Sequence, residues 1–542
     1  MKKIITFLFI GFITLNNIYS QIFVAPDGND SNPGTIDKPL GTLQKAQELA
    51  KPGDTVYIRG GIYKIRPNQI SRVVSNLFAC VTYLDKNGIE GKTIKYWAYP
   101  GETPVFDFSD FKPPNQRVVG IYVIGNYIHL KGLEMTGIQV TITSHTESYC
   151  IYSRGSHNIF EQISMHDNIG TGLRHYKGGY NLFLNCDAYR NWDNVSEDKL
   201  GSNTDGFGCH PDAGGKGNIF KGCRAWFNSD DGFDIIRAKE SVVFDSCWSF
   251  YNGYSTSFQS LGDGNGFKAG GFAHDTADKI PSPVPKHTIK FCIAVGNKAN
   301  GFYSNHHLEG NEWYNNTAYQ NDINFNMVNR ESAQIDNIWF NGYNHVLKNN
   351  LSYKPRNTDT AYIDNKKNTL SHNSFDLGLK ITDDDFVSLD VSQLTSPRKQ
   401  DGSLPDIDFM RPVKGSSLID AGVDLGFEFY GIAPDLGALE SKEVTDIKNY
   451  ENKIPDEFEL YQNYPNPFND ATNIIFNIPY STHVKILIYN SLGQAVYTLL
   501  DEFKDKGSYT VHFNGNHLPS GVYFCKVAAG RSSKVKQMVL LK

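Results

Sequence analysis

"NIFKGCRAWFNSDDGFD", residues 218–234, contains the repeat that decides the fold. Its first eleven residues recur in altered form as "NLFLNCDAYRN" at 181–191, "VVFDSCWSFYN" at 242–252 and, one residue shorter, "TIKFCIAVGN" at 288–297. Where no loop intervenes, the repeat is 23 or 24 residues long, as from Asn158 to Asn181 and from Asn218 to Val242. Short alternating apolar runs, Gly and Asn at the turns and a period of this length are typical of a β-solenoid. The sequence therefore predicts an all-β fold, a right-handed parallel β-helix.

Two columns of side chains follow from this alignment. One turn of the coil carries Asn191, Asn228, Asn252, Asn297 and Asn321, whose amides can hydrogen-bond from one coil to the next. A second repeated position lies five residues before each of the first four Asn residues. It carries Cys186, Cys223, Cys247 and Cys292. An exported protein with eight cysteines could form disulfides, but a column of small buried thiols accounts for the shared slot without any bond. We therefore favour free thiols.

The ends of the 542-residue chain differ from the repeat region. Residues 1–20 begin with two lysines, continue with an apolar run and turn polar before Gln21, which predicts a signal peptide. No other segment is apolar and long enough to suggest a membrane span. The net charge of -6 and the lack of a basic cluster argue against a nucleic-acid partner.

The predicted β-helix domain covers residues 21–440 and a polar linker covers 441–456. Near its start, "TLQKAQELAKPGD" at 42–54 has Leu43, Ala46 and Leu49 at helical spacing, which predicts a short helix over the open end of the solenoid. Residues 457–542 contain clean strands separated by turns and predict a small β-sandwich.

The last segment resembles a known sorting signal. Its stretches "YQNYPNPFNDATNIIFNIP", "VKILIYNSLGQAVYTL" and "LPSGVYFCKV" are similar to the C-terminal sorting domain of the type IX secretion system. This resemblance implies the type IX machinery as a partner and a secreted or cell-surface protein. The alternative is a carbohydrate-binding sandwich, but no aromatic platform stands out in the segment.

A second repeated motif lies inside the coils. An Asp/Asn-Gly-Phe core occurs in "NTDGFG" (203–208), "SDDGFD" (229–234), "GNGFKAG" (264–270) and "ANGFYS" (299–304). Alignment by coil predicts a buried column of Phe207, Phe233, Phe267 and Phe302. The residue after each Phe then faces outward, so that Asp234 and Lys268 become neighbours on adjacent strands about 4.8 Å apart.

These coils bring acidic side chains together. Asp205 and Asp231 share a column two residues before the Phe, with Asp230 beside them and Asp234 facing outward. Carboxylates crowded in this way repel each other unless a cation lies among them, and an all-oxygen ligand set favours calcium. A divalent cation and partial burial would both disfavour the ammonium form of the nearby Lys268, which predicts a lowered pKa and a role as a base.

The same residues resemble polysaccharide lyase family 9, the β-helix pectate and rhamnogalacturonan lyases, over roughly residues 22–440. The resemblance implies calcium held by Asp205, Asp230, Asp231 and Asp234, with Lys268 as the catalytic base. It implies β-elimination at a galacturonate residue of pectin. Homogalacturonan and rhamnogalacturonan I both contain that residue, so the resemblance does not decide which of the two polymers is the substrate.

Two other functions fit parts of the pattern. "NTDG" followed by an Asp pair resembles the carboxylates of polygalacturonases, but the His-Gly and Arg-Ile-Lys elements of that family are missing. A non-catalytic β-helix adhesin would explain the repeats and the export signals, but not the aspartates around Lys268.

Contacts to an acidic glycan require cations and aromatic rings near the same coils. The candidates for substrate binding are Arg237, Lys298, His306 and Tyr303, with Lys239 and His307 nearby. Arg237 would point inward if the strand continued past Asp234, so its role requires a turn there. We expect the protein to act as a monomer.

Overall fold

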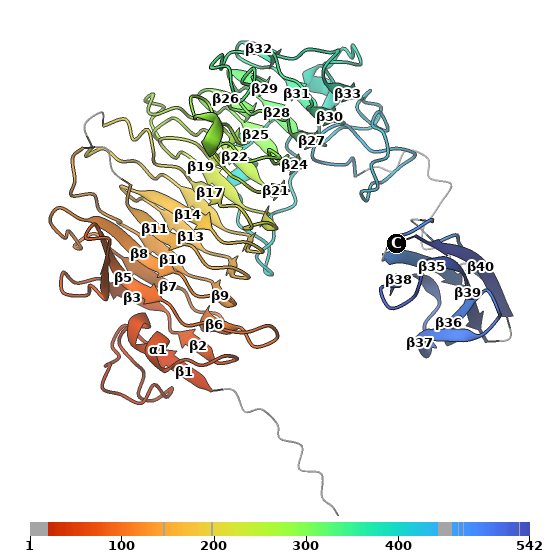
Figure 1. Cartoon of the computed structure of the whole chain (residues 1–542), viewed down its shortest axis with the longest axis horizontal. Coiled ribbons are helices and arrows are strands. Elements are labelled where there is room, and N and C mark those ends of the chain that lie inside the picture. The colour runs from red at the N-terminus through yellow and green to blue at the C-terminus, as the bar shows by residue number, and fades with distance from the viewer. Residues whose placement is uncertain are drawn as a thin grey trace, which may run out of the picture. The chain divides into compact units, whose positions relative to one another are not determined.

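The computed structural model describes residues 20–144, 147–196, 199–442, 458–463, 466–469, 471–530 and 532–541. Apart from Ser20, the predicted signal peptide lies outside these residues, as does the predicted linker from residue 443 on. The chain divides into two compact units at Glu443 and Val444. In the larger unit the chain winds through stacked coils (Figure 1).

Three long sheets, one strand of each per regular coil, form the walls of the larger unit. The first sheet contains β1 (Gln21–Val24), β2 (Thr55–Ile58), β6 (Ile94–Ala98), β9 (Ile128–Lys131), β12 (Ile159–Glu161), β15 (Leu182–Leu184), β18 (Asn218–Lys221), β21 (Val242–Asp245), β24 (Thr288–Lys290), β27 (Glu312–Tyr314), β30 (Val346–Lys348) and β33 (Thr369–Ser371). The second sheet contains β3 (Gly61–Lys64), β7 (Pro104–Asp107), β10 (Glu134–Thr136), β13 (Ser164–His166), β16 (Asp187–Tyr189), β19 (Arg224–Trp226), β22 (Trp248–Phe250), β25 (Ile293–Val295), β28 (Thr317–Tyr319) and β31 (Leu351–Tyr353). The third sheet contains β4 (Arg72–Val74), β5 (Phe78–Leu84), β8 (Arg117–Val123), β11 (Tyr149–Ser153), β14 (Thr171–Lys177), β17 (Phe207–Pro211), β20 (Phe233–Asp234), β23 (Phe267–Lys268), β26 (Asn300–Tyr303), β29 (Ile323–Asn326) and β32 (Thr358–Ala361).

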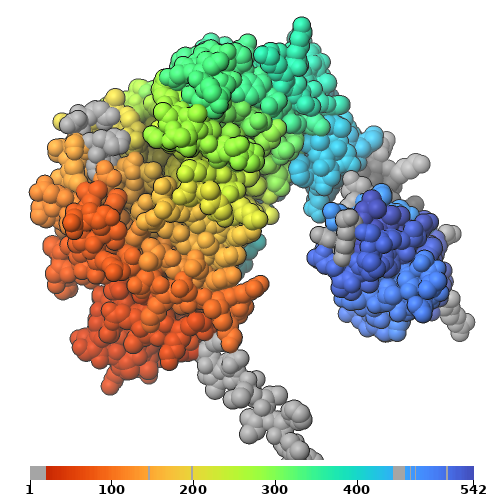
Figure 2. Space-filling model, in the orientation of Figure 1, coloured from red at the N-terminus to blue at the C-terminus, as the bar shows by residue number. Residues whose placement is uncertain are grey.

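Neighbouring strands of these sheets are parallel, except for the antiparallel pair β4 and β5. The predicted right-handed parallel β-helix is confirmed. Side chains fill the spaces between the ribbons of successive coils on the face drawn in Figure 2.

The predicted columns hold the coils in register. The rings of Phe207, Phe233, Phe267 and Phe302 are buried and stacked, with centroids 4.9 to 5.2 Å apart, and Phe325 continues the column. At the turn after the second sheet, each Asn amide donates to the next, as from Asn228 Nδ2 to Asn252 Oδ1 at 2.9 Å. This ladder runs from Asn168 to Asn324 and includes the five predicted members. Buried amides that are bonded on both sides fix the stacking of one coil on the next.

The cysteines are free and buried, which confirms the preference for thiols. In the repeated slot, the Sγ atoms of Cys186 and Cys223 lie 3.3 Å from backbone carbonyls of the preceding coil. The thiols therefore act as small apolar fillers between coils.

The predicted helix forms as α1 (Leu43–Leu49), capped by the Thr42 hydroxyl, which accepts a bond from the Lys45 amide. Leu43 and Ala46 are buried in the core of the larger unit, but Leu49, the third residue at helical spacing, is 41% exposed. Gln47 is buried instead, with its Nε2 donating to Asp85. The buried face of α1 therefore consists of residues 43, 46 and 47.

The coils end earlier than predicted. Residue 371 closes β33, the last strand of the stack among the described residues, whereas the sequence suggested coils to about 440. Residues 372–442 contain two short 3₁₀ helices (Asp383–Asp385 and Val391–Thr395) and otherwise irregular backbone. Their apolar side chains, such as Leu394, Ile407 and Phe409, cluster with Trp248 and Ile293 of the second sheet. This segment therefore covers an apolar sheet face. A third 3₁₀ helix (Ala277–Lys279) lies in the loop after Lys268.

The smaller unit is an antiparallel β domain with its own apolar core. One sheet contains β34 (Glu459–Leu460), β35 (Ala471–Ile478) and β38 (Gly507–Asn514); the other contains β36 (Thr482–Asn490), β37 (Ala495–Lys504), β39 (Gly521–Ala529) and β40 (Ser532–Leu540). The two sheets agree with the predicted sandwich. No helix in the described parts of the chain is both long and apolar enough to cross a membrane.

Candidate active site

Short strands of the third sheet set the position of each polar side chain at the candidate site. The register pairs Phe207 with Phe233 and Phe233 with Phe267, so the residues after them pair as well: Gly208 with Asp234 and Asp234 with Lys268. In the next pair of neighbouring strands, β23 and β26, Lys268 pairs with Tyr303. The predicted outward column is therefore confirmed. It follows from the buried Phe stack, because side chains alternate between the two faces of a strand.

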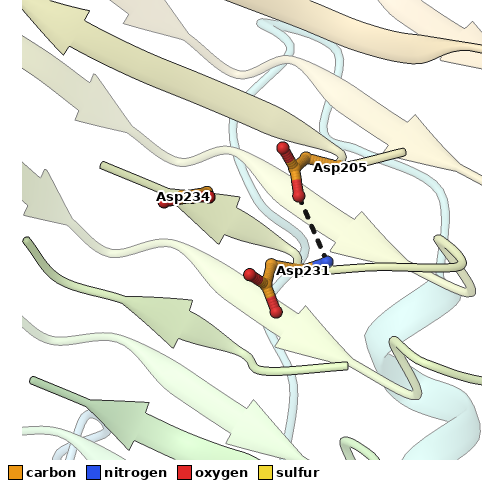
Figure 3. Close-up of side chains that lie close together, drawn as sticks. All are labelled: Asp205, Asp231 and Asp234. Atoms are coloured by element: carbon orange, nitrogen blue, oxygen red, sulfur yellow. Dashed lines mark hydrogen bonds between the residues drawn. The ribbon is translucent and has the colours of Figure 1, made fainter. Parts of the chain in front are cut away.

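Three aspartates converge at the entry to this column. Asp205, Asp231 and Asp234 each offer a carboxylate oxygen, and these oxygens lie within 4.8 Å of one another. Figure 3 shows the three side chains and the bond from the Asp231 amide to Asp205 Oδ1, which is 3.3 Å long. Asp231 Oδ1 accepts bonds of 2.8 Å from both the backbone and the side-chain amide of Asn265. Asp234 Oδ1 accepts a bond from the Ile236 amide at 2.6 Å.

Asp230 lies beside this group rather than within it. Its side chain is buried, and its Oδ1 accepts a 2.8 Å bond from the Asp263 amide. Its own backbone amide donates to the Thr204 carbonyl. The sequence predicted four converging carboxylates, and the structure brings three together with the fourth at their edge.

Lys268 reaches into the acidic group. Its Nζ lies 3.0 Å from Asp231 Oδ2 and 3.3 Å from Asp234 Oδ2, and its side chain is only 13% exposed. Despite this ion pair, Asp231 Oδ2 is buried and accepts no hydrogen bond from the described residues. A buried carboxylate oxygen without a hydrogen bond is costly for the protein and suits a site where a further ligand binds.

The carboxylates perturb one another's ionisation. Burial raises the pKa of Asp205 well above its usual range, and the charges of Asp234 and Asp231 raise it further. Burial and the charges of Asp231 and Asp205 likewise raise the pKa of Asp230 well above its usual range. Burial also raises the pKa of Asp231, although Lys268 opposes it. Burial acts to raise the pKa of Asp234 too, but Lys268 and His210 hold it below the usual value.

The direction of the Lys268 shift differs from the sequence-based expectation. Burial acts to lower the pKa of Lys268, as expected, but Asp231, Asp234, Asp230 and Asp205 together raise it well above its usual range. The expected lowering requires the charge of a divalent cation to offset these four carboxylates. The donor set suits such a cation, because the described group consists of carboxylate oxygens, which hard ions prefer.

Arg237 lies on a turn directly after β20. Its φ of 58° is in the left-handed region, which breaks the strand alternation and turns the side chain outward. The side chain is 64% exposed, and its Nε donates to Asp275 at 2.7 Å. The turn on which its predicted role depended is therefore present.

The other candidates differ in their contacts. Tyr303 lies on the strand next to Lys268, and its hydroxyl is 3.1 Å from His306 Nε2. Lys298 instead donates to the carbonyls of Leu261 and Gly262, so its ammonium holds the loop beside Asp230. Lys239 pairs with Asp212 at 2.9 Å, and the buried His307 contacts the Pro285 carbonyl.

Sequence reasoning missed Asn265 as a partner of the acidic group. It continues the column of Asp205 and Asp231, two residues before Phe267, and its Oδ1 accepts in turn from Asn300 Nδ2 at 2.7 Å. The signal was present in "GNGFK", where Asn replaces Asp at the repeated position. Asn265 fixes Oδ1 of Asp231 and leaves Oδ2 directed at Lys268.

Lys268, on the outer face of the β-helix, is ion-paired with buried aspartates, and comparison with known proteins shows that the chain is a polysaccharide lyase. Residues 22–372 match the model described as "Pel9A-like, right handed beta helix region", and the chain belongs to this family. Residues 462–541 match the secretion system C-terminal sorting domain, which makes the protein extracellular or attached to the cell surface.

Similar proteins cover most of the chain. Pectate lyase L of Dickeya chrysanthemi is 37% identical over 438 residues, which are 79% of this chain and 91% of that protein. Pectate lyase L of Paenibacillus polymyxa is 34% identical, over 75% of this chain and 84% of its own length. Among solved structures, a rhamnogalacturonan lyase is 42% identical with a TM-score of 0.70, covering 73% of this chain and 96% of its own. Pectate lyase Pel9A is 35% identical with a TM-score of 0.63, over 78% and 97%.

Proposed function

We propose that this protein is a secreted, calcium-dependent lyase that cleaves galacturonate-containing pectin by β-elimination, acting as a monomer. The observation that carries the proposal is the contact of Lys268 Nζ with Asp231 and Asp234, on the coils where the aspartates converge. The pectate and rhamnogalacturonan lyases among the similar proteins support the same reaction.

Asp205, Asp230, Asp231 and Asp234 would hold the calcium, and Asp231 Oδ2, which accepts no hydrogen bond from the described residues, supports this assignment. Calcium bound there would neutralise the uronate carboxylate of the substrate and stabilise the negative charge that develops when the adjacent C5 loses its proton. Asn265 keeps Asp231 in place through its two hydrogen bonds. Asp263 orients Asp230 through its backbone amide.

Lys268 removes the C5 proton of the galacturonate residue with its neutral amine. The electron pair left at C5 forms the C4–C5 double bond while the C4–O4 bond breaks. O4 departs with its bonding electrons and takes up a proton, and the new non-reducing end is an unsaturated uronate. Arg237, Tyr303 and His306 would contact the sugars around this residue, and Lys298 would support the loop beside Asp230.

The spacing of the carboxylates also bears on hydrolysis. Inverting hydrolysis needs two carboxyl groups about 6.5 to 9.5 Å apart, so that a water fits between them. Here the oxygens of Asp205, Asp231 and Asp234 lie within 4.8 Å of one another. This spacing supports elimination over inverting hydrolysis.

The direct test follows absorbance of the unsaturated uronate product on polygalacturonate and on rhamnogalacturonan I, with calcium and with chelator. We expect absorbance to grow on at least one polymer and to stop in chelator. Growth on one polymer alone would identify the substrate. New reducing ends without absorbance would instead indicate a hydrolase, and no cleavage of either polymer would favour an adhesin.

Calcium should stabilise the protein more at pH 8 than at pH 5. Because the pKa values of Asp205, Asp230 and Asp231 are raised, their own contribution to the stability of the calcium-free protein is largest below about pH 4 and is lost as pH rises through the raised values. The same ionisation creates the ligands that calcium needs. Thermal unfolding with calcium and with chelator should therefore show a difference in Tm that widens with pH. An equal difference at both pH values would contradict the proposed ligands.

A further inference from the structure

Trp339 is an exposed aromatic side chain beside the candidate active site. Its side chain is 59% exposed, whereas Trp248 and Trp313 are buried. It is the one tryptophan among the exposed large hydrophobic residues of the described chain. It follows β29, in a loop that carries no repeat signal in the sequence. A large exposed ring on a secreted protein indicates a surface where a ligand binds.

The ring is held in a fixed orientation. Its plane meets the His306 ring almost edge-on, at 87° with centroids 4.9 Å apart, and the Tyr362 ring lies 6.1 Å away. The preceding carbonyl, of Ile338, lies 2.5 Å from His306 Nδ1. The following residue, Phe340, exchanges two backbone bonds of 2.9 and 3.0 Å with Asn329. Contacts before, at and after Trp339 therefore fix its position.

A buried arginine fixes the rest of the loop. Arg330 is 4% exposed, and its guanidinium donates to the carbonyls of Ile335 and Ala333 within the loop. It also donates to the Asp275 carbonyl at 2.6 Å, in the loop that follows Lys268. His274 and Asp336 join the same two loops by a 2.9 Å contact. The loop of Trp339 is thus attached to the loop that leaves the catalytic strand.

A short series of contacts connects Trp339 with the lysine. Lys268 and Tyr303 are register neighbours on adjacent strands, and the Tyr303 hydroxyl contacts His306, against whose ring Trp339 lies. Trp339 therefore lies on the C-terminal side of Lys268 along the stack of coils. Arg237, on the coil before Lys268, is the other exposed candidate.

From these contacts we propose that Trp339 is the stacking platform of a sugar-binding subsite, which takes a pyranose ring of the polysaccharide next to the residue attacked by Lys268. The inference rests on the proposed function. The C–H face of a pyranose is apolar and matches the face of an indole, while the sugar hydroxyls stay in water. Because the ring is already held in place, little conformational entropy is lost when the sugar stacks on it.

The first experiment measures kinetics on the polymer that the parent protein cleaves. Trp339→Ala should raise KM about 10-fold or more and change kcat by less than about twofold, since the ring binds substrate without taking part in proton transfer. Trp339→Phe keeps a smaller ring and should raise KM about threefold. Tyr430→Ala is the matched control, because Tyr430 is 68% exposed in the irregular segment 372–442 and has no place in the proposed site. Its KM should equal that of the parent.

The second experiment measures binding without turnover. In the Lys268→Ala background with calcium, oligosaccharides from polygalacturonate and from rhamnogalacturonan I are titrated while tryptophan fluorescence is recorded. We expect one of the two sets to change the emission, and the change to disappear when Trp339→Phe is added. The Trp339→Phe variant tests the proposed subsite even if Trp339→Ala does not fold.

The outcomes separate the two proposals. An active parent with unchanged KM in both Trp339 variants, or a fluorescence change that persists without Trp339, would overturn the subsite and leave the lyase intact. A parent that forms no unsaturated product from either polymer would overturn the proposed function. Loss of the fluorescence change in Trp339→Phe would still establish sugar binding at this ring.

Discussion

Lys268→Ala is expected to lower the rate of uronate elimination about 10²- to 10⁴-fold, the range that a positioned general base contributes. The substitution removes an amine that lies within 3.3 Å of both Asp231 and Asp234. It leaves the proposed calcium ligands in place, so calcium affinity should not fall. The measurement is the absorbance of unsaturated product, with calcium affinity determined by calorimetry on the same sample.

Two further variants make this result specific. Lys268→Arg keeps a positive charge among the aspartates. Because a guanidinium stays protonated at the pH of the assay, it cannot act as a base, and this variant should be as inactive as Lys268→Ala. Lys290→Ala is the matched control, because Lys290 forms a 3.0 Å ion pair with Asp245 in the first sheet and its side chain is 22% exposed. It should keep at least about half of the parent activity, because a partly exposed pair away from the reaction contributes little. If Lys268→Ala retained full activity, Lys268 would not be the base.

Asp231→Asn should weaken calcium binding at least about 100-fold and abolish activity at low calcium, because calcium affinity depends on the number of charged ligands. The amide can still accept both bonds from Asn265, so the coil should keep its local structure. Its NH₂ group, however, would replace the carboxylate oxygen that lies 3.0 Å from Lys268 Nζ. Calorimetric titration of calcium measures the first effect and the absorbance assay measures the second.

The control for this substitution is Asp212→Asn. Asp212 forms a 2.9 Å ion pair with Lys239, both side chains are more than one-third exposed, and neither lies in the acidic group. Calcium affinity should not change, because exposed ion pairs contribute little and are screened by solvent. Equal calcium affinity of Asp231→Asn and the parent would exclude Asp231 as a ligand.

The regular part of the molecule could be predicted from the sequence because one physical rule repeats in every coil. A buried Phe at one position fixes the outward direction of the next residue, and this placed Asp234, Lys268 and Tyr303 on neighbouring strands. The Asn ladder and the free thiols followed from the same alignment. The predicted calcium and substrate roles of these residues remain to be tested.

Features set by loops were not predictable in this way. Lys298 was assigned to the substrate, but the direction of its ammonium depends on carbonyls of residues 261 and 262, whose path has no repeat. The contacts of Trp339 depend on a loop held by Arg330, more than fifty residues away from its partner Asp275. The irregular segment 372–442 has apolar residues like those of a coil, and only the structure shows that they cover the second sheet.

Two inserted loops flank Lys268, residues 254–263 before it and residues 272–286 after it, and they leave the stacking of the phenylalanines unchanged. Asn228 and Phe233 are five positions apart, whereas Asn252 and Phe267 are fifteen apart because residues 254–263 are inserted, and yet Phe233 and Phe267 still stack at 4.9 Å. The Phe stack that aligns Lys268 with Asp231 and Asp234 is therefore independent of the length of this insertion, whereas Asp263 at the end of the insertion contacts Asp230. Insertions and deletions in these loops that keep Asp263 in place can alter which polymer fits without moving the reacting groups. In evolution or by loop exchange, one reaction centre can thus be fitted to different polymers.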